Sequence, residues 1–410
     1  IEEYKVEMYM NNYEHHMLLD VEEVKCYVTS KLQYFQKDEV LQAEEIGDGN
    51  INYVFRVWNP DSGKSIIIKQ ADKFLRSSGR ALDVYRNKIE AEILKLEGML
   101  AEGFVPKVYA YDETMCVLAM EDISAYKNMR KELMEGRFFP HFAENIAEFL
   151  ARTLLPTTDL VLDRAVKKDN VRLFLNKELC DITEDLVLTE PYDNYKNRNI
   201  VLPENEEFVK EFLYENEQLK ADVAQLRDSF MNHAQALVHG DLHSGSIFIN
   251  EQGIKIIDPE FAFYGPMGYD IGNVIGNLFF AWARIQFIEP RHTEFITWCS
   301  HTVADTIDLT MEKLSKVYEQ CVECPLYRTK EFKQHYLRDV MSDSLGYAGT
   351  EIIRRVVGDS KVMEVTSIKE TDKRVAFERA LLKMGIWLIR NRKVIHEGME
   401  VSEQFNMICS

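Results

Sequence analysis

Residues 237–270 read LVHGDLHSGSIFINEQGIKIIDPEFAFYGPMGYD. Two short apolar runs in this segment flank the turn residues EQG, a pattern that predicts a β-hairpin. Asp241 stands before the first strand, and Asp258 and Glu260 stand after the second. Because a tight hairpin returns the chain to its starting point, we expect these three carboxylates to converge.

Carboxylates that converge on one spot suit phosphoryl transfer. One acid takes the proton of the acceptor hydroxyl, and the others hold Mg²⁺ against the phosphates. The three candidates for these roles are Asp241, Asp258 and Glu260, and the last two flank Pro259. Acids beside a hairpin are usually solvated turn residues, but His-Gly-Asp and Asp-Pro-Glu at hairpin spacing together favour the functional interpretation.

The composition disfavours several other classes of function. Of 410 residues, 46% are hydrophobic and 29% are charged, as in an ordinary globular protein. The 49 basic and 68 acidic residues give a net charge of −19, which disfavours nucleic acid and anionic membranes as partners. No apolar run approaches the ~18 residues of a membrane-spanning helix. Seven cysteines, an odd number, favour reduced thiols and a cytoplasmic location. Cys321 and Cys324 form a C-x-x-C without a second pair at zinc spacing, so we expect no metal or redox role for them.

The sequence up to residue 122 predicts a small antiparallel sheet. A helix is expected at 21–35, and strand-like alternation at 44–58 is interrupted by Gly47-Asp48-Gly49. A strong turn and a third, very apolar strand follow, and this strand ends on Lys69. Two consecutive hairpins with Gly-x-Gly in the first turn can lay backbone N–H groups over phosphates. Lys69 stands where a phosphate-pairing lysine is needed.

A helix expected at 84–98 supplies a partner for this lysine. Glu90 or Glu92 can face Lys69 and hold it over the α- and β-phosphates, and Glu90 is our choice. Solvated glutamates are common on helices, so the ion pair is a hypothesis that the structure can test.

Two further strand-like runs, at 104–111 and 115–120, precede the connector Glu121-Asp122-Ile123. A connector after the last strand of a small sheet exposes extended backbone, which suits the edge of an adenine. Strand signals nearly vanish beyond it, so we divide the chain into an N-lobe, 1–122, and a C-lobe, 123–410. The helical segments predicted in the C-lobe are 141–155, 206–214, 218–236, 270–284, 291–318, 328–357 and 372–390.

The predicted helix at 328–357 ends in the tandem arginines Arg354 and Arg355. Arginine suits phosphoryl oxygens because its fork donates two parallel, charge-assisted hydrogen bonds. The small residues Gly346, Ala348 and Gly349 on the same helix allow either close packing or close approach of a ligand. For an arbitrary Arg-Arg pair, a surface salt bridge is the alternative.

These features together resemble the protein-kinase-like superfamily, and more narrowly its small-molecule branch of aminoglycoside and choline kinases. Two departures from that branch, Ser246 in place of an asparagine and Asp-Pro-Glu in place of Asp-Phe-Gly, resemble the 5-methylthioribose kinase family. The segments similar to that family are HGDLHSGSI at 239–247, DPEFAFYGPMGYDIG at 258–272, GYAGTEIIRR at 346–355, IGDGNINYVF at 46–55 and ELCDITEDLVLTEPY at 178–192.

The resemblance implies an α+β, bilobal, protein-kinase-like fold with a catalytic β-hairpin in the helical lobe, and a homodimer. It implies ATP and Mg²⁺ as cofactors. Asp241, Arg354 and Arg355 would act in catalysis and contact the sugar, and Asp258 and Glu260 would bind the metal. The residues expected to hold the nucleotide are Gly47, Gly49, Asn50, Asn52, Lys69, Glu90, Glu121, Asp122, Ile123, Asp258, Pro259 and Glu260. Whether Asn50 or Asn52 touches ATP stays open.

The expected reaction is phosphorylation of the anomeric 1-hydroxyl of 5-methylthioribose in methionine salvage. The family's tryptophan-containing lid is replaced here by FLRSSGR at 74–80, which leaves 5-deoxyribose open as the preferred sugar. Choline, an aminoglycoside or another small alcohol is a further alternative. A non-catalytic nucleotide-binding module is the alternative from a different class, and the presence of Lys69, Asp241 and Asp258 disfavours it.

Overall fold

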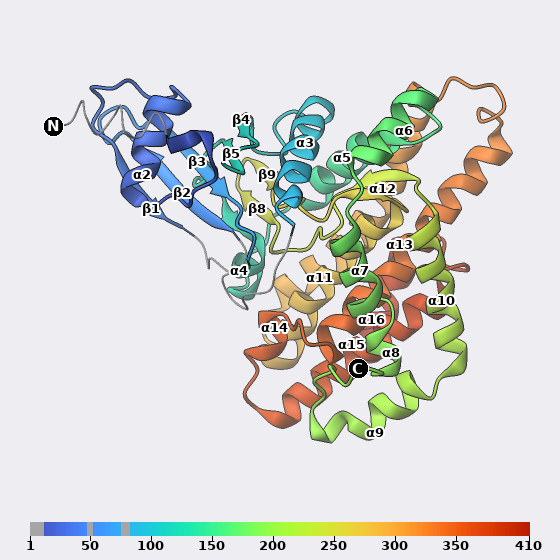
Figure 1. The fold of residues 1–410 in the computed structure, drawn as a ribbon. Helices are drawn as coiled ribbons and strands as arrows, with labels where there is room; N and C mark the ends of the chain where they lie inside the picture. Colours follow the sequence, from blue (N-terminus) through green and yellow to red (C-terminus); the bar gives the residue numbers. More distant parts are fainter. Residues whose placement is uncertain (1–11, 47–51, 75–82) are drawn as a thin grey trace. The chain divides into compact units, whose positions relative to one another are not determined.

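The computed structural model describes residues 12–46, 52–74 and 83–410 (Figure 1). The predicted flap residues Gly47, Gly49 and Asn50 lie outside this part of the chain, as do residues 75–80 of the FLRSSGR segment. The chain divides into two compact units, each with its own packing. Unit 1 consists of Ile1–Ala125 together with Asp258–Glu260, and unit 2 consists of Tyr126–Ile257 and Phe261–Ser410. The domain boundary after residue 122 stays a prediction.

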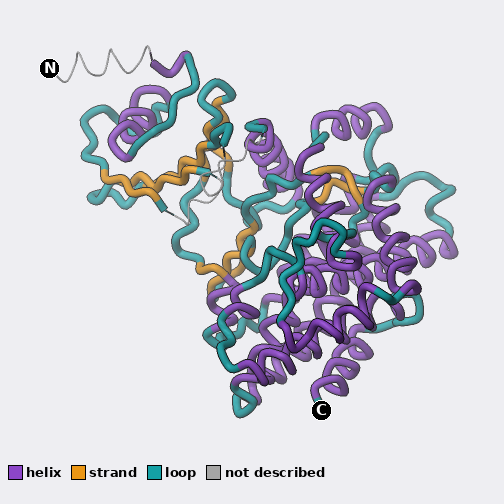
Figure 2. Tube along the Cα trace, turned by 60° about the horizontal axis from the view of Figure 1, so that its bottom comes forward, coloured by secondary structure: helices purple, strands orange, loops and turns teal. Residues whose placement is uncertain are grey.

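Unit 1 contains a five-stranded antiparallel sheet with the order β1-β2-β3-β5-β4. Its strands are β1 (Gln42–Glu45), β2 (Tyr53–Trp58), β3 (Ser65–Gln70), β4 (Val108–Asp112) and β5 (Val117–Met120). The helices described in this unit are α2 (Val21–Cys26), continued by a π-helical turn at Tyr27–Lys31, and α3 (Tyr85–Leu100). A short 3-10 turn at Asn12–Glu14 precedes α2. Figure 2 shows the strands of this sheet as one band of neighbouring segments.

The apolar side chains of β3 fix which way its lysine points. Ile66 and Ile68 are fully buried in a core that α2 and the sheet share. Because successive side chains of a strand point to opposite faces, Lys69 points to the other face of the sheet, toward α3. In the strand register Lys69 lies opposite Val54 of β2 and Leu118 of β5, so it is at the centre of the sheet.

Unit 2 is mostly helical. Its helices are α4 (Met129–Met134), α5 (Phe142–Leu154), α6 (Arg164–Leu173), α7 (Lys177–Leu186), α8 (Glu190–Asp193), α9 (Glu206–Val209), α10 (Glu217–Asn232), α11 (Gly268–Ile288), α12 (Thr293–Cys321), α13 (Lys330–Val357), α14 (Met363–Thr366), α15 (Thr371–Asn391) and α16 (Gly398–Cys409). Short 3-10 or π-helical turns lie at Leu155–Thr157, Pro203–Asn205 and Lys210–Tyr214. The α+β fold, an antiparallel sheet followed by a mostly helical region, is therefore confirmed.

The predicted hairpin is present in unit 2. It consists of β8 (Ile247–Asn250) and β9 (Gly253–Ile256), and β6 (Lys127–Asn128) pairs with the outer side of β8. A second pair of short strands consists of β7 (Ala236–Val238), which precedes the hairpin in the sequence, and β10 (Phe263–Gly265), which follows it. Val238 of β7 pairs with Phe263 of β10, and this pairing fixes both ends of the segment that contains the His-Gly-Asp motif.

Helices α11 and α13 pack backbone to backbone because α11 presents a row of glycines. A Cβ atom added to Gly268, Gly272 or Gly276 would come within 2.7, 2.5 and 2.9 Å of backbone atoms of α13. On α13, Gly349 makes a similar approach to α15, where an added Cβ would lie 2.5 Å from Gly385 O. The glycine-rich segment of α13 therefore serves close helix packing, which was one of the two predicted interpretations.

The helices predicted from long apolar periods are confirmed within a few residues, whereas α6, α7 and α16 and the short helices α4, α8 and α14 were not predicted. The α6 sequence RAVKKDNVRL has no apolar stripe, and its buried residue is Lys167, whose Nζ donates to Asp159, Ala234 O and Gln235 O. Within the described residues, every helix is too short or too polar to span a membrane.

Candidate functional site

Lys69 of β3 is the centre of a charged cluster in unit 1. Only 4% of the residue is exposed, and its Nζ lies 2.7 Å from Glu90 Oε1 and 2.5 Å from Asp258 Oδ1. Of the two glutamates considered, Glu90 is the one that faces Lys69, and Glu92 instead pairs with Lys95 on the outer side of α3. Glu90 is fully buried, so the lysine is its charge partner within a dry environment.

Arg86 forms the second half of this cluster, and sequence reasoning missed it. Its Nε lies 3.4 Å from Glu260 Oε2, and its Nη2 donates to Asn52 Oδ1 at 3.0 Å. Asn52 in turn donates from Nδ2 to Glu260 Oε2 at 3.4 Å. The available signal was spacing on α3, because Arg86 and Glu90 are four residues apart and therefore lie on one face of the helix.

Among the described residues, the carboxylates of Glu90, Asp258 and Glu260 face two cations, Lys69 and Arg86. Burial opposes the charge of Lys69, but the nearby carboxylates, Asp258 first, outweigh burial and raise the pKa of its ammonium group. Burial is also the main reason that the pKa of Glu260 is raised, although Lys69 and Arg86 oppose the rise.

The donor set fits a bound Mg²⁺. Magnesium prefers carboxylate oxygens and keeps part of its shell for water and phosphate oxygens, so two protein carboxylates suffice. Asp258 and Glu260 are the two carboxylates that would hold the metal. Within residues 12–46, 52–74 and 83–410, no three His, Cys, Asp or Glu side chains are grouped as ligands for a metal ion.

The connector Glu121-Asp122-Ile123 is partly occupied by its own neighbours. The Glu121 N–H donates to Lys107 O at 2.8 Å, which extends the pairing of β4 with β5. Asp122 Oδ2 accepts from Arg56 Nε at 2.7 Å. The role of this connector at an adenine stays a prediction, and the Glu121 N–H is already engaged.

In unit 2, the His-Gly-Asp loop is fixed through its backbone. Asp270 of α11 accepts the N–H of His239 at Oδ2 (2.6 Å) and the N–H of Gly240 at Oδ1 (3.0 Å). Gly240 has a φ of +83°, and an added Cβ would lie 2.4 Å from Phe261 O, so glycine is required there.

The His239 ring holds the two ends of the hairpin segment together. Its Nε2 lies 2.9 Å from Ile257 O, and because a carbonyl only accepts, Nε2 carries the proton. Its Nδ1 then accepts the Asp241 N–H at 3.3 Å. Ile257 N–H donates to Ser246 O at 3.0 Å, so the residue before Asp258 is bonded twice to the loop that carries Asp241.

The Asp241 carboxylate is held by the tandem arginines. Arg354 Nη2 lies 3.3 Å and Arg355 Nη2 lies 3.6 Å from Asp241 Oδ1. His243 Nε2 lies 3.4 Å from the other oxygen, Oδ2. Burial disfavours charge on Asp241, but His243, Arg354 and Arg355 outweigh it and hold the pKa of this carboxyl well below its usual range.

A fully buried acid, Glu351, orients the two arginines and was also missed. Its Oε2 lies 2.5 Å from Arg354 Nε, and its Oε1 lies 3.0 Å from Arg355 Nε. Asn277 of α11 donates to Glu351 Oε1 at 2.9 Å. The spacing E-x-x-R-R was the signal, because residues three and four apart share one face of a helix.

The structure thus collects the predicted residues into two groups, one in each unit. Lys69, Glu90, Asn52, Asp258 and Glu260 meet in unit 1, and Asp241, Arg354 and Arg355 meet in unit 2. The convergence of all three hairpin acids stays a prediction, because Asp241 belongs to a different unit from the other two.

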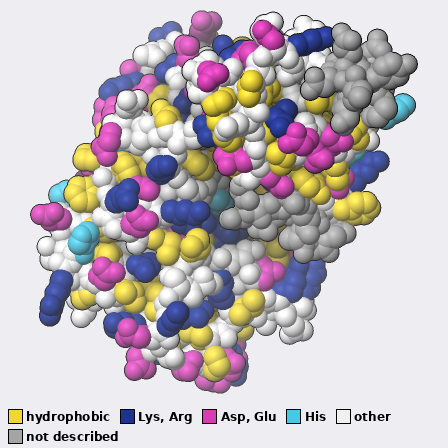
Figure 3. Space-filling model, turned by 90° about the vertical axis from the view of Figure 1, so that its left-hand side faces the viewer, with side chains coloured by type: hydrophobic (Ala, Val, Ile, Leu, Met, Phe, Trp, Pro, Cys, Tyr) yellow, Lys and Arg dark blue, Asp and Glu magenta, His cyan; other side chains and the backbone are white. Residues whose placement is uncertain are grey.

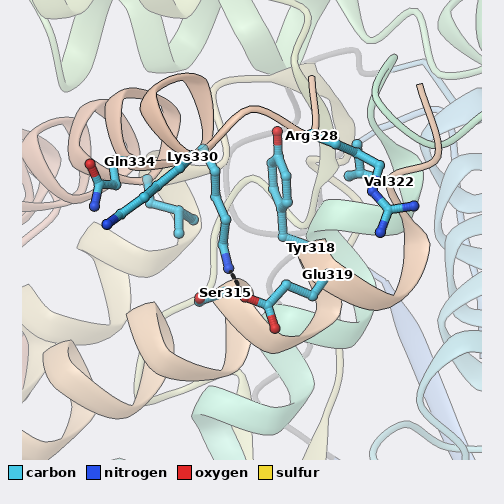
Figure 4. Close-up of a pocket in the computed structure, with 9 residues that line it drawn as sticks. Ser315, Tyr318, Glu319, Val322, Arg328, Lys330 and Gln334 are labelled. Atoms are coloured by element: carbon cyan, nitrogen blue, oxygen red, sulfur yellow. Dashed lines mark hydrogen bonds and ion pairs between the residues drawn. The ribbon is translucent and has the colours of Figure 1, made fainter. Parts of the chain in front are cut away.

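A separate pocket in unit 2 lies between the end of α12 and the start of α13 (Figure 4). Arg328, Lys330 and Lys333 are among its lining residues, and Lys333 pairs with Glu319 across it. None of the predicted site residues lines this pocket. Cys321 and Cys324 of the C-x-x-C motif are close in the sequence to the lining residues, and both are free thiols.

Figure 3 shows how the charged side chains of the described residues are distributed on one face of the protein. Acidic and basic side chains are interspersed there and do not gather by sign into separate regions. Among the side chains drawn in colour, this face has no extended basic patch of the kind that binds nucleic acid.

Comparison with known proteins first defines the class. Residues 42–303 match the family described as the phosphotransferase enzyme family. The crystal structure of a choline kinase from Cryptosporidium parvum Iowa II shares the fold, with a TM-score of 0.51 and 14% identity over 91% of this chain and 99% of that chain. The protein is therefore a phosphotransferase.

Full-length relatives then define the family. A methylthioribose kinase from Bacillus velezensis is 38% identical over 379 residues, which cover 92% of this chain and 93% of the relative. A methylthioribose kinase from Geobacillus sp. is 36% identical over 382 residues and 92% of each chain. The chain belongs to the methylthioribose kinase family, and the resemblance noted from its motifs is confirmed.

Proposed function

We propose that this protein transfers the γ-phosphoryl group of ATP to the anomeric hydroxyl of 5-methylthioribose, giving 5-methylthioribose 1-phosphate in methionine salvage. The observation that carries the proposal is the Asp241 carboxylate held between two arginines on one helix. This arrangement places a proton acceptor next to donors suited to phosphoryl oxygens. The family of the chain supplies the sugar.

Asp241 orients the acceptor hydroxyl and takes its proton late. A carboxylate whose pKa lies far below neutrality is a weak base in the ground state. In a loose phosphoryl-transfer transition state, the attacking oxygen becomes acidic only as its bond to phosphorus forms. A permanently ionised, well-oriented carboxylate suits that order of events.

Arg354 and Arg355 stabilise the charge of the transferring group. Each uses Nε on Glu351 and Nη2 toward Asp241, so both guanidinium planes are fixed before substrate binds. Preorganised donors need no reorganisation when charge develops on the phosphoryl oxygens. Their contact with the sugar, predicted from the resemblance, is part of this proposal.

Lys69 holds the α- and β-phosphates, and Glu90 keeps it in place. Asp258 and Glu260 would hold Mg²⁺, which offsets the negative charge of the phosphates when bound. Asn52, which now steadies Glu260, would turn to the phosphates together with the flap of Gly47, Gly49 and Asn50. Pro259 keeps the two acids apart, and the connector Glu121-Asp122-Ile123 would receive the adenine.

A coupled assay of ADP release tests the proposal. 5-Methylthioribose, 5-deoxyribose, ribose, choline and kanamycin are compared in parallel at equal ATP and Mg²⁺. We expect the highest kcat/KM with 5-methylthioribose. A preference for 5-deoxyribose would reassign the sugar, and a preference for choline or kanamycin would overturn the proposal.

The first prediction concerns Asp241→Asn. This change should abolish turnover, because the hydroxyl loses its proton acceptor, and should leave the affinity for ATP within about twofold, because nucleotide-binding groups are elsewhere in the chain. Isothermal titration with a non-hydrolysable ATP analogue measures the affinity. A variant that retains a tenth or more of the turnover would remove Asp241 from its role.

From the family resemblance, we also propose that the protein is a homodimer in the cytoplasm. Light scattering during size-exclusion chromatography tests whether the protein is a homodimer. Fractionation of cells that express the chain tests whether it is cytoplasmic.

A further inference from the structure

The His243 ring lies against the backbone of the loop that contains Asp241. Its Nδ1 accepts the N–H of Gly245 and the N–H of Ser246, each at 3.1 Å. Ser246 Oγ lies at the same distance from Nδ1 and also donates to Asp241 O at 3.0 Å. The loop from Asp241 to Ser246 is thus held by hydrogen bonds among its own residues, most of them to the His243 ring.

These contacts determine the tautomer of the ring. A backbone N–H can only donate, so Nδ1 must present a lone pair to Gly245 and Ser246. The proton of the neutral ring therefore sits on Nε2, the nitrogen 3.4 Å from Asp241 Oδ2. The N–H of the neutral ring is thereby on the side of the ring that lies near the Asp241 carboxylate.

We propose that His243 is a positioning residue for phosphoryl transfer, whose backbone-locked Nε2–H fixes the Asp241 carboxylate for the acceptor hydroxyl. This inference rests on the proposed function, because it assigns Asp241 as the proton acceptor. With Oδ1 facing Arg354 and Arg355 and Oδ2 facing His243, rotation of the carboxylate is restricted from both sides. One rotamer of the acid is then presented to the sugar.

The same geometry explains the serine at position 246. In the wider kinase branch an asparagine stands there, whereas here the short Ser246 side chain is 3% exposed and turned onto Asp241 O and His243 Nδ1. Ser246 therefore supports the loop through its hydroxyl, which donates to Asp241 O, and the ring through its N–H, which donates to His243 Nδ1. Glu260 in unit 1 remains the second carboxylate proposed for a metal.

The absence of a side chain at Gly245 leaves room for the His243 ring. A Cβ atom added to Gly245 would lie 2.9 Å from His243 Cε1 and 3.1 Å from its Nδ1, closer than carbon atoms pack. A Gly245→Ala change thus displaces the imidazole without altering its chemistry. It offers a test that does not depend on removing the histidine.

Two substitutions at position 243 test the roles of the two ring nitrogens, Nδ1 and Nε2, independently. His243→Gln carries an N–H to the place of Nε2, whereas His243→Asn carries an acceptor to the place of Nδ1 and is too short to reach Asp241. We expect His243→Ala to lower kcat by about 10²-fold, as a misplaced catalytic group does, with KM for ATP nearly unchanged. His243→Gln should restore most of the loss, and His243→Asn should behave like His243→Ala.

A double-mutant cycle adds a second measurement. Gly245→Ala should lower kcat about as much as His243→Ala, and the double variant should lose no more than either, because both remove the same contact. Losses that multiply in the double variant would overturn the proposal. Equal activity of His243→Gln and His243→Asn would do the same, because it would leave only a structural role for the ring.

A readout without turnover separates this inference from the proposed function. Long-range ¹H–¹⁵N NMR of the full chain labelled at histidine, with the resonance of residue 243 assigned by its absence in His243→Gln, reports which nitrogen is protonated. We expect a protonated Nε2 and a bare Nδ1. A proton on Nδ1 would overturn the inference even if the wild-type protein phosphorylates 5-methylthioribose, and an inactive wild-type protein with a protonated Nε2 would overturn only the proposed function.

Discussion

Arg354 and Arg355 each contact two acids, and the two acids differ in their surroundings. Glu351 is fully buried and binds the Nε atoms, whereas the side chain of Asp241 is 27% exposed and faces the Nη2 atoms. Because Glu351 fixes the inner end of each guanidinium, the outer end points to Asp241, the proposed proton acceptor. Glu351 therefore sets the geometry of the residues that are proposed to contact substrate.

We predict that Glu351→Gln weakens both stability and catalysis. The two arginines lose the charge that compensates them in a buried site, which should lower the free energy of unfolding by about 3 kcal/mol. The kcat should fall on the order of 10²-fold as the guanidinium groups reorient. Denaturant unfolding and the ADP-release assay measure the two effects.

The control for this prediction is Glu312→Gln. Glu312 pairs with Lys316 on the exposed side of α12, so its loss should leave the free energy of unfolding almost unchanged. A similar loss of stability in both variants would contradict the assigned importance of the Glu351 pairing.

The lowered pKa of Asp241 also predicts how the free energy of unfolding depends on pH. Its pKa in the folded protein is held well below the usual value, so its contribution to stability is complete above the unfolded pKa of about 4 and is lost as pH falls through the folded pKa. The difference in unfolding free energy between wild type and Asp241→Asn should be flat between about pH 5 and 8 and shrink below about pH 4. Denaturant titrations across this range measure it, and a difference that shrinks near pH 7 would contradict the assignment.

At the scale of elements, the glycine row of α11 positions the arginines, because α13 carries them. We predict that Gly272→Ala lowers the free energy of unfolding by about 3 kcal/mol, since its Cβ would lie 2.5 Å from Ser344 O. The kcat should fall as well, because α13 must shift against the loop that contains Asp241. Unfolding and steady-state kinetics on the same preparation give both values.

Gly98 of α3 is the matched control. Its added Cβ would meet only Val105 Cγ2 at 3.7 Å, an ordinary contact. Gly98→Ala should therefore raise stability by about 0.5–1 kcal/mol through helix propensity and leave kcat unchanged. A loss of stability in this variant would show that the Gly272 effect is not specific to the α11–α13 contact.

Much of this fold was predictable because its long helices and its hairpin have clear periods. The tandem arginines, Lys69 and the three hairpin acids were also recognisable, since each lies in a short motif. Arg86 was missed: its four-residue spacing from Glu90 places both on one face of α3, but its partner Glu260 lies far away in the sequence. The same holds for Asp270, which binds the backbone of His239 and Gly240 rather than a side chain.

At the scale of the whole molecule, the chain passes between its two units at three places. It leaves unit 1 after Ala125, returns for Asp258–Glu260, and leaves again at Phe261. The carboxylates proposed for Mg²⁺ are therefore packed with unit 1 but are joined at both ends to unit 2. Binding of metal and nucleotide at these residues should stabilise the folded protein against unfolding.

We predict that ADP with Mg²⁺ raises the thermal midpoint, by an amount that corresponds to about 2.7 kcal/mol at a hundredfold excess over Kd. Removal of Mg²⁺ with EDTA should abolish most of this gain, because the phosphates would then face Asp258 and Glu260 without a cation between them. Differential scanning fluorimetry measures the midpoints, with Asp258→Asn as a second way to weaken the metal site. An equal gain with and without Mg²⁺ would exclude these acids as its ligands.

The backbone of Asp258 has a further consequence for future experiments. Its φ of +62° lies in the left-handed region, where asparagine and aspartate are the side chains most readily accommodated. Asparagine at this position keeps both the size and the local conformation of the native residue while it removes a charge. Asp258→Asn thus removes the charge alone, so any change in its dependence on Mg²⁺ can be attributed to the carboxylate and not to a rebuilt loop.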